Sequence, residues 1–178
     1  MSSRIRLVDA SVDDAGVLSD AGGRLFGQAY GKYSRPDDLQ VHVEQYFGCE
    51  NVAAELRKPD VSYTMACDGN AIAGFIKTRR GPAPDTVPAV TAIEVQQLYV
   101  DTQLQRRGVG RMLMDGAVAA ARATGESGLW LSVWQDADWA TAFYEAYGFR
   151  RVGTAEFLLG QSRFMDYLMW LALDGGGE

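Results

Sequence analysis

The chain has few of the residues that cross-link small domains or bind metals. Of its 178 residues only two are cysteine, Cys49 and Cys67, and only one is histidine. Two cysteines are too few for a disulfide framework and lack the paired spacing of a zinc site. No cluster of His, Cys, Asp or Glu has metal-ligand spacing. The composition excludes a disulfide-rich secreted domain, and we expect no metal.

Long apolar runs and an excess of basic residues are also lacking. No stretch approaches the roughly 18 apolar residues of a membrane-spanning helix, and the first residues have no signal-peptide core. The net charge of −6 argues against nucleic acid or an anionic membrane as the main partner, and is compatible with a cationic small molecule. We expect a soluble cytoplasmic protein. A length of 178 residues, 47% of them apolar, indicates one domain over residues 1–178.

The common glycine motifs of nucleotide-binding proteins are missing too. There is no Gly-x-x-x-x-Gly-Lys-Ser/Thr loop and no Gly-x-Gly-x-x-Gly turn. The chain has instead a predicted strand over 91–100, a glycine turn carrying Arg106 and Arg107, and a predicted helix over 109–124. The first N–H groups of such a helix are free, and the two arginines add positive charge beside them. This unit predicts a pyrophosphate-binding site.

Periodicity and turn residues predict the other elements. The segment 81–88 holds three of the five prolines and is expected to be a loop outside the sheet. Helices are predicted from Ser11 through Phe26, from Pro36 to before Pro59 with a break at 48–50, and over 138–147, and strands over 4–8, 61–67, 71–78, 128–134, 149–152 and 162–173, before a loose tail at 174–178.

Two sequence patterns are informative, one in the glycine turn and one downstream of it. Gln105, Gly108 and Gly110 are spaced as Gln-x-x-Gly-x-Gly, and residues 143–149 read Phe-Tyr-x-x-x-Gly-Phe. In these residues the chain resembles the GNAT acyl-CoA N-acyltransferases. The resemblance implies an α/β fold with a mixed, mainly antiparallel sheet of six or seven strands and helices on both faces. Within the family the chain is most similar to the bacterial spermine/spermidine N-acetyltransferase type, in Trp130, Trp134 and the strand over 166–173.

The resemblance implies acetyl-CoA as co-substrate. The backbones of Leu98, Tyr99 and Val100 would pair with the pantetheine arm and donate an N–H to the thioester oxygen. Alternatively, these three are ordinary buried strand residues. The pyrophosphate would lie on the turn and the first helical residues, which are Gln105, Arg106, Arg107, Gly108, Val109, Gly110 and Arg111.

Direct transfer of an acetyl group to a primary amine requires a base and an acid. An alkylamine, with a pKa near ~10.4, is protonated at neutral pH, so a carboxylate should remove its proton, and Glu94 is the predicted base. Tyr144 is predicted to protonate the departing thiolate, because GNAT members often have a tyrosine there. Alternatively, Glu94 pairs with a cation or faces solvent, and Tyr144 packs in an aromatic cluster with Phe143 and Tyr147.

The acceptor is predicted to be a polyamine or another small cationic amine, and a protein N-terminus, a lysine side chain or an aminoglycoside is the alternative. The wall of the acceptor-binding site is expected in the N-terminal helices. The candidate residues there are Tyr30, Tyr33, His42 and Glu44. The resemblance also allows a homodimer, with a second copy of this chain as partner.

Two positions depart from the family pattern. Many relatives have Asn seven residues before the tyrosine, where this chain has Ala137, so a cofactor contact is lost or supplied differently. Gln96 stands where polyamine-acetylating relatives tend to have a second glutamate.

Three rival functions remain open from the sequence. A Cys/His nucleophile would need His42 beside a thiol, but we expect His42 on a helix surface and both thiols buried and inert. A non-catalytic acyl-CoA-binding module would keep the glycine turn without a working acid and base. A structural subunit would bind no CoA.

Overall fold

A seven-stranded sheet lies at the centre of the computed structural model, which describes residues 5–173. The strands are β1 (Arg6–Asp9), β2 (Val61–Asp68), β3 (Ala71–Pro82), β4 (Thr91–Val100), β5 (Gly128–Trp134), β6 (Arg150–Leu159) and β7 (Ser162–Ala172). The helices are α1 (Ala15–Tyr30), α2 (Pro36–Phe47), α3 (Cys49–Leu56), α4 (Val109–Ala123) and α5 (Asp138–Tyr147), with 3-10 turns η1 (Val12–Asp14) and η2 (Thr102–Leu104).

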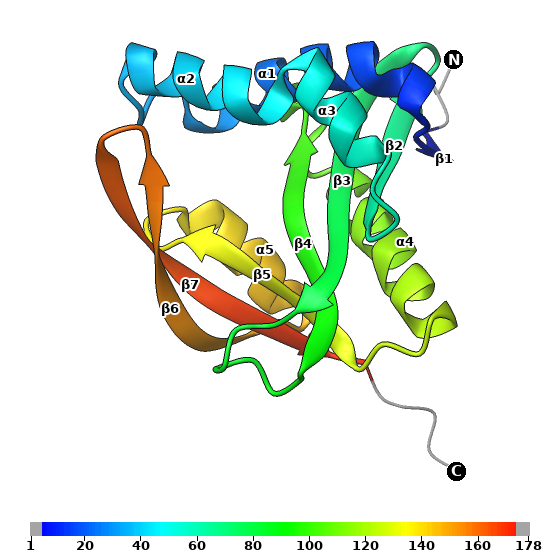
Figure 1. Ribbon diagram of the computed structural model, residues 1–178, viewed down its shortest axis with the longest axis vertical. Helices are drawn as coiled ribbons and strands as arrows, with labels where there is room; N and C mark the ends of the chain where they lie inside the picture. The colour runs from blue at the N-terminus through cyan, green and yellow to red at the C-terminus, as the bar shows by residue number, and fades with distance from the viewer. Residues whose placement is uncertain (1–4, 174–178) are drawn as a thin grey trace.

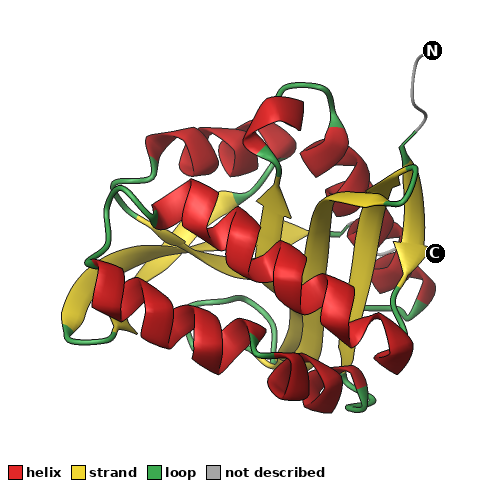
Figure 2. Cartoon of the chain, turned by 90° about the horizontal axis from the view of Figure 1, so that it is seen from above, coloured by secondary structure: helices red, strands yellow, loops and turns green. Residues whose placement is uncertain are grey.

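The strands follow the order β1-β2-β3-β4-β5-β7-β6, and every neighbouring pair is antiparallel except β4 and β5. Helices α1, α2 and α3 cover one face of the sheet, and α4 and α5 cover the other (Figure 2). The expected α/β fold, with a mainly antiparallel sheet and helices on both faces, is confirmed. No helix in the described part of the chain is long and apolar enough to span a membrane.

Local sequence signals account for most element ends. The Ser11 N–H donates to the Asp14 carboxylate at 2.8 Å in a capping box that opens η1 and leads into α1. Gly48 separates α2 from α3 at the expected break. Gly148, with φ of 120°, ends α5. The expected start of the first strand at residue 4 and the tail at 174–178 lie outside the described residues.

Two strands are longer than predicted. Gly81 and Pro82, expected in a loop outside the sheet, pair with Ala92 and Thr91 of β4. That prediction was wrong because β2 stops pairing with β3 at Arg79, so Pro82 lies where β3 has no second neighbour that needs its missing N–H. Strand β6 was predicted to end at 152 but continues to 159, past a register shift between Arg151 and Gly153.

The sheet parts between β4 and β5. These parallel strands are paired only at Ile93 with Leu129 and at Glu94 with Trp130. Beyond these pairs the two strands diverge, as Figure 1 shows for the region between their arrowheads. The β4 residues after Glu94 therefore keep backbone N–H and C=O groups that no β5 residue uses.

Helix α4 is anchored to the sheet by fully buried side chains, which makes its packing testable. Leu113 has no exposed surface, whereas Met112, next to it, is 38% exposed. Replacing Leu113 with alanine is expected to lower the free energy of unfolding by about 2–5 kcal/mol through lost burial and a cavity. Urea denaturation measures this change. The control Met112→Ala should cost less than about 1 kcal/mol, and equal losses would contradict the packing described.

Candidate active site

Two cavities of similar size open along the parting of β4 and β5. One, of about 570 Å³, lies at the start of α4 and is bordered by Gly108, Gly110 and Tyr144; we call it the helix-end cleft. The other, of about 560 Å³, lies among α1, α2 and the β6–β7 hairpin, and we call it the aromatic cavity. The residues that border both cavities, which we call the junction, are Tyr30, Gln96, Gln97, Tyr99 and Ser132.

The glycine turn gives the helix-end cleft an open backbone surface. Gly108 is the N-cap of α4 with φ of 83°, and a Cβ built on it would meet no atom within 4 Å. The N–H groups of the first turn of α4 have no carbonyl partner within the helix, and the positive end of the helix dipole lies behind them. This surface fits a diphosphate, because the backbone can approach an anion without a side chain between them.

Most of the predicted cofactor residues border the helix-end cleft, and two do not. Val109 is 2% exposed and packs in the core, so only its backbone faces the turn. Arg107 is not among the lining residues. Gln105 donates from its amide to the Val100 carbonyl at 3.4 Å and so links the turn to β4. The predicted residues that do line the cleft are Leu98, Tyr99, Val100, Gln105, Arg106, Gly108, Gly110 and Arg111.

Tyr144 of α5 borders the helix-end cleft and packs against its aromatic neighbours. Its ring lies 5.3 Å from that of Phe143 and 5.7 Å from that of Phe149. Burial first, and then the nearby Tyr30, raises the pKa of the Tyr144 phenol well above 10. The phenol is therefore protonated at neutral pH, which is the state needed to give a proton to a thiolate.

Ala137, at the position of the family's Asn, offers only its backbone. It has no exposed surface and is the N-cap of α5, without a capping side chain. Its N–H donates to the Trp134 carbonyl at 3.0 Å, and its carbonyl accepts from the N–H of Thr141 at 3.0 Å. The start of α5 is thus held by main-chain bonds, and no side-chain amide is present here to reach a cofactor.

The aromatic cavity takes its name from rings contributed by both halves of the chain. His42 stacks on Phe26 at 4.3 Å and lies 4.4 Å from Tyr46. The expectation of a surface His42 was wrong: it is 8% exposed, and burial lowers its pKa to about 4, so it is neutral at pH 7. The lining rings are those of Phe26, Tyr30, Tyr33, His42, Tyr46, Tyr99, Trp134, Phe157 and Phe164.

The predicted acceptor residues divide between the cavity and the outer surface. Tyr30 and Tyr33 line the aromatic cavity, and the Tyr33 ring lies 5.1 Å from that of Trp134. Glu44 does not line it, because this exposed side chain accepts a hydrogen bond from Gln40 at 2.9 Å along α2. Cys49, expected to be buried, is exposed at the start of α3.

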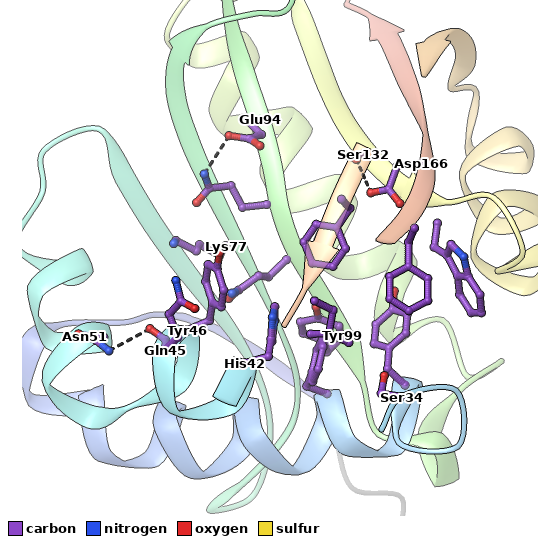
Figure 3. Close-up of a pocket in the computed structure, with 18 of the residues that line it drawn as sticks. Ser34, His42, Gln45, Tyr46, Asn51, Lys77, Glu94, Tyr99, Ser132 and Asp166 are labelled. Atoms are coloured by element: carbon purple, nitrogen blue, oxygen red, sulfur yellow. Dashed lines mark hydrogen bonds between the residues drawn. The ribbon is translucent and has the colours of Figure 1, made fainter. Parts of the chain in front are cut away.

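Two carboxylates of the aromatic cavity lack a basic partner. Lys77 of this cavity is paired with Glu55 at 2.8 Å. Glu94 accepts from the Gln96 amide at 2.8 Å, and Asp166 accepts from the Ser132 hydroxyl at 2.5 Å. Neither Glu94 nor Asp166 forms an ion pair with any residue in 5–173. Figure 3 shows them on separate walls, from β4 and β7.

No local sequence pattern indicates the pair formed by Ser132 and Asp166. They are 34 residues apart and meet because β5 pairs with β7, with Ser132 opposite Leu168 and Trp134 opposite Asp166. Gln97, one of the junction residues, was also not predicted as a site residue. Its Oε1 and the Asp166 Oδ1 are buried acceptors without a hydrogen-bond donor in the described residues. The only available sequence signal for Gln97 and Asp166 would have been a polar residue among the apolar residues of a predicted strand.

Comparisons with known proteins agree with this geometry. Residues 25–149 match the acetyltransferase (GNAT) family. An uncharacterised N-acetyltransferase of Lactobacillus delbrueckii subsp. lactis is 27% identical over 170 residues, covering 95% of this chain and 98% of the relative. One from Mycobacterium tuberculosis (strain H37Rv) is 28% identical over 156 residues, covering 88% of this chain and 96% of the relative.

Solved structures show the same fold at low sequence identity. The PaiA N-acetyltransferase of Thermoplasma acidophilum, in complex with coenzyme A, is 17% identical and superposes with a TM-score of 0.79, covering 96% of this chain and 99% of that one. Arabidopsis thaliana NAA60, in complex with acetyl-CoA, is 17% identical with a TM-score of 0.73, covering 97% of this chain and 100% of that one.

The chain belongs to the GNAT acetyltransferase family. It is an N-acetyltransferase that uses acetyl-CoA as co-substrate. The narrower likeness to spermine/spermidine acetyltransferases stays a prediction.

Proposed function

We propose that this enzyme acetylates a primary amino group of a small cationic amine, such as a polyamine, by direct attack on acetyl-CoA. The observation that carries the proposal is the aromatic cavity, with carboxylates at Glu94 and Asp166 that form no ion pair within residues 5–173. Its rings add favourable sites for an ammonium group. Both carboxylates accept hydrogen bonds from neutral groups only, so a cationic ligand that supplies the missing charge is favoured.

The boundary of the aromatic cavity favours a small molecule over a peptide chain. Helix α2 lies next to the β6–β7 hairpin (Figure 1), and the Ser162 hydroxyl of the hairpin donates to Asp38 of α2 at 3.0 Å. Gly160 lies so close that an added Cβ would be 2.1 Å from the Asp38 carboxylate. Because this contact joins α2 to the hairpin, two of the elements that line the aromatic cavity, it narrows the opening left for an extended polypeptide. A free diamine or longer polyamine needs no such open groove.

The two ligands would meet at the junction. The diphosphate on the first turn of α4 directs the thioester along the free edge of β4, where Leu98 to Val100 offer backbone donors. The amine enters through the aromatic cavity and attacks the carbonyl carbon. Tyr144, on the cleft side, protonates the departing thiolate. Water exclusion by the surrounding rings strengthens each of these polar contacts.

A panel of amines tests the proposal. Release of the CoA thiol is expected with spermidine, spermine and putrescine, with kcat/KM at least about tenfold above that for butylamine or a peptide N-terminus, since a second ammonium gains a charged hydrogen bond. The substitution Glu94→Gln should raise the KM for spermidine about tenfold. The control Glu50→Gln, on the exposed side of α3, should leave it unchanged. A peptide or butylamine as the best acceptor would overturn the small-polyamine proposal.

A further inference from the structure

Ser132 is one of the five junction residues, and the acceptor nitrogen would react at the junction. A nitrogen that bonds to the thioester carbon must contact both cavities, and Ser132 is one of the residues bordering both. Its side chain is exposed to this space from β5. None of the other junction residues, Tyr30, Gln96, Gln97 and Tyr99, is a carboxylate. A carboxylate base for the amine must therefore lie outside the junction and act through one of the junction residues.

The two carboxylates of the aromatic cavity that form no ion pair, Glu94 and Asp166, reach the junction through different groups. Glu94 is bonded to the amide nitrogen of Gln96, and an amide does not pass a proton from one neighbour to the next. Asp166 is bonded to the hydroxyl of Ser132, which donates one proton and accepts another. Only the Asp166 side offers a continuous protein path for a proton. Glu94, which lines the aromatic cavity, is placed instead to bind positive charge of the acceptor.

Asp166 also has the surroundings of a functional carboxylate. It is 6% exposed, borders the aromatic cavity, and has one oxygen, Oδ1, without a donor in the part of the chain that the structure describes. A carboxylate buried in this way destabilises the fold unless a ligand or a reaction uses it. The strand pairing supplies no reason for a charge here, because Asp166 faces Trp134 on β5 and Ala155 on β6.

We propose that Asp166, acting through the hydroxyl of Ser132, takes the proton from the attacking amine; this inference rests on the proposed function. The ammonium gives one proton to Ser132, which passes its own to Asp166 and from there to solvent. The neutral nitrogen then attacks the carbonyl carbon, the C–N bond forms and the C–S bond breaks. Tyr144 protonates the thiolate and regains a proton from solvent, and the second nitrogen proton leaves to solvent. The products are the amide, CoA thiol and one released proton.

Of the titratable groups that line the two cavities, the carboxylates and His42 belong to the acid side of the pH profile. Burial raises the pKa of Asp166, and the Ser132 hydrogen bond only partly offsets this. A base with a raised pKa works only above that value, so kcat should fall as the pH drops through it. His42 has a pKa of about 4, and those of Tyr30, Tyr99 and Tyr144 are raised. The remaining charged groups facing the aromatic cavity are Glu55, Lys77, Arg79 and Glu94.

Steady-state kinetics of full-length variants with spermidine and saturating acetyl-CoA test the relay. Asp166→Asn is expected to lower kcat about 100-fold or more and to remove the acid limb of the kcat–pH profile. Ser132→Ala should lower kcat similarly, whereas Ser132→Thr, which keeps the hydroxyl on an exposed side chain, should restore it to within about threefold. Glu94→Gln should raise the KM and keep the acid limb. Acetyl-CoA affinity by calorimetry should be unchanged in all four variants.

Two results would overturn the relay while leaving the proposed function in place. One is an Asp166→Asn enzyme that keeps both its kcat and its acid limb, and the other is loss of that limb in Glu94→Gln alone. The absence of turnover by the wild-type enzyme with every amine of the panel would remove the proposed function itself, and the relay with it. Misfolding is separable, because Asp166→Asn removes a buried charge and should not lower the thermal midpoint.

Discussion

Replacing Gly108 with aspartate is expected to weaken acetyl-CoA binding about 100-fold or more, equivalent to about 2.7 kcal/mol, while the protein stays folded. Gly108 has φ of 83° and its missing Cβ faces open space, so the new carboxylate would project into the helix-end cleft. There it would repel a diphosphate and occupy the positive end of α4. Isothermal titration calorimetry with acetyl-CoA measures the loss.

Gly69→Asp is the matched control for this prediction. Gly69 also has positive φ, of 61°, and an added Cβ would meet nothing within 4 Å, but it lies in the turn between β2 and β3. The variant therefore carries the same backbone strain and the same added charge away from the cleft. Its affinity for acetyl-CoA should equal that of the wild type. Normal binding by Gly108→Asp would refute the placement of the diphosphate on α4.

Tyr144→Phe is expected to lower kcat about 100-fold and to leave the affinity for acetyl-CoA nearly unchanged. The substitution keeps the ring, which packs on Phe143 and Phe149, and removes only the proton that the thiolate requires. Because the pKa of this phenol is raised well above 10, the wild-type acid stays protonated throughout the neutral range. Stopped-flow thiol release and calorimetry together separate chemistry from binding.

Tyr147→Phe is the control on the same helix. The Tyr147 hydroxyl donates to Asp115 at 2.6 Å on α4 and is not among the residues lining the helix-end cleft. Loss of this hydrogen bond should cost about 1 kcal/mol of stability and no turnover. Should Tyr144→Phe turn over as fast as Tyr147→Phe, Tyr144 would be a packing residue and the thiolate would take its proton from solvent.

The parts of the fold that depend on neighbouring residues were predictable from the sequence. The turn at Gly108, the helix that follows it and the break at Gly48 each depend on residues within one or two turns of the chain. Pro82 misled the prediction, since whether a strand accepts proline depends on which neighbours it has, and that is a property of the assembled sheet.

The acceptor side depended on contacts between distant segments and was only partly predictable. His42 was expected on a helix surface, but Phe26 and Phe157, from elsewhere in the chain, pack against it. Asp166 reads as one charge in an amphipathic strand until β5 brings Ser132 to it. Glu44 shows the opposite error, since an acidic residue in the expected region faces away from the cavity. Local periodicity does not decide which face of α2 is covered.

The parting of β4 from β5 has a consequence for how the sequences of relatives diverge. Where β4 runs without its neighbour, the groups offered to a ligand are peptide units, which every amino acid supplies alike. Drift of the side chains along this edge leaves those donors and acceptors in position. Proteins that share only 17% of their residues with this chain can therefore keep the same architecture.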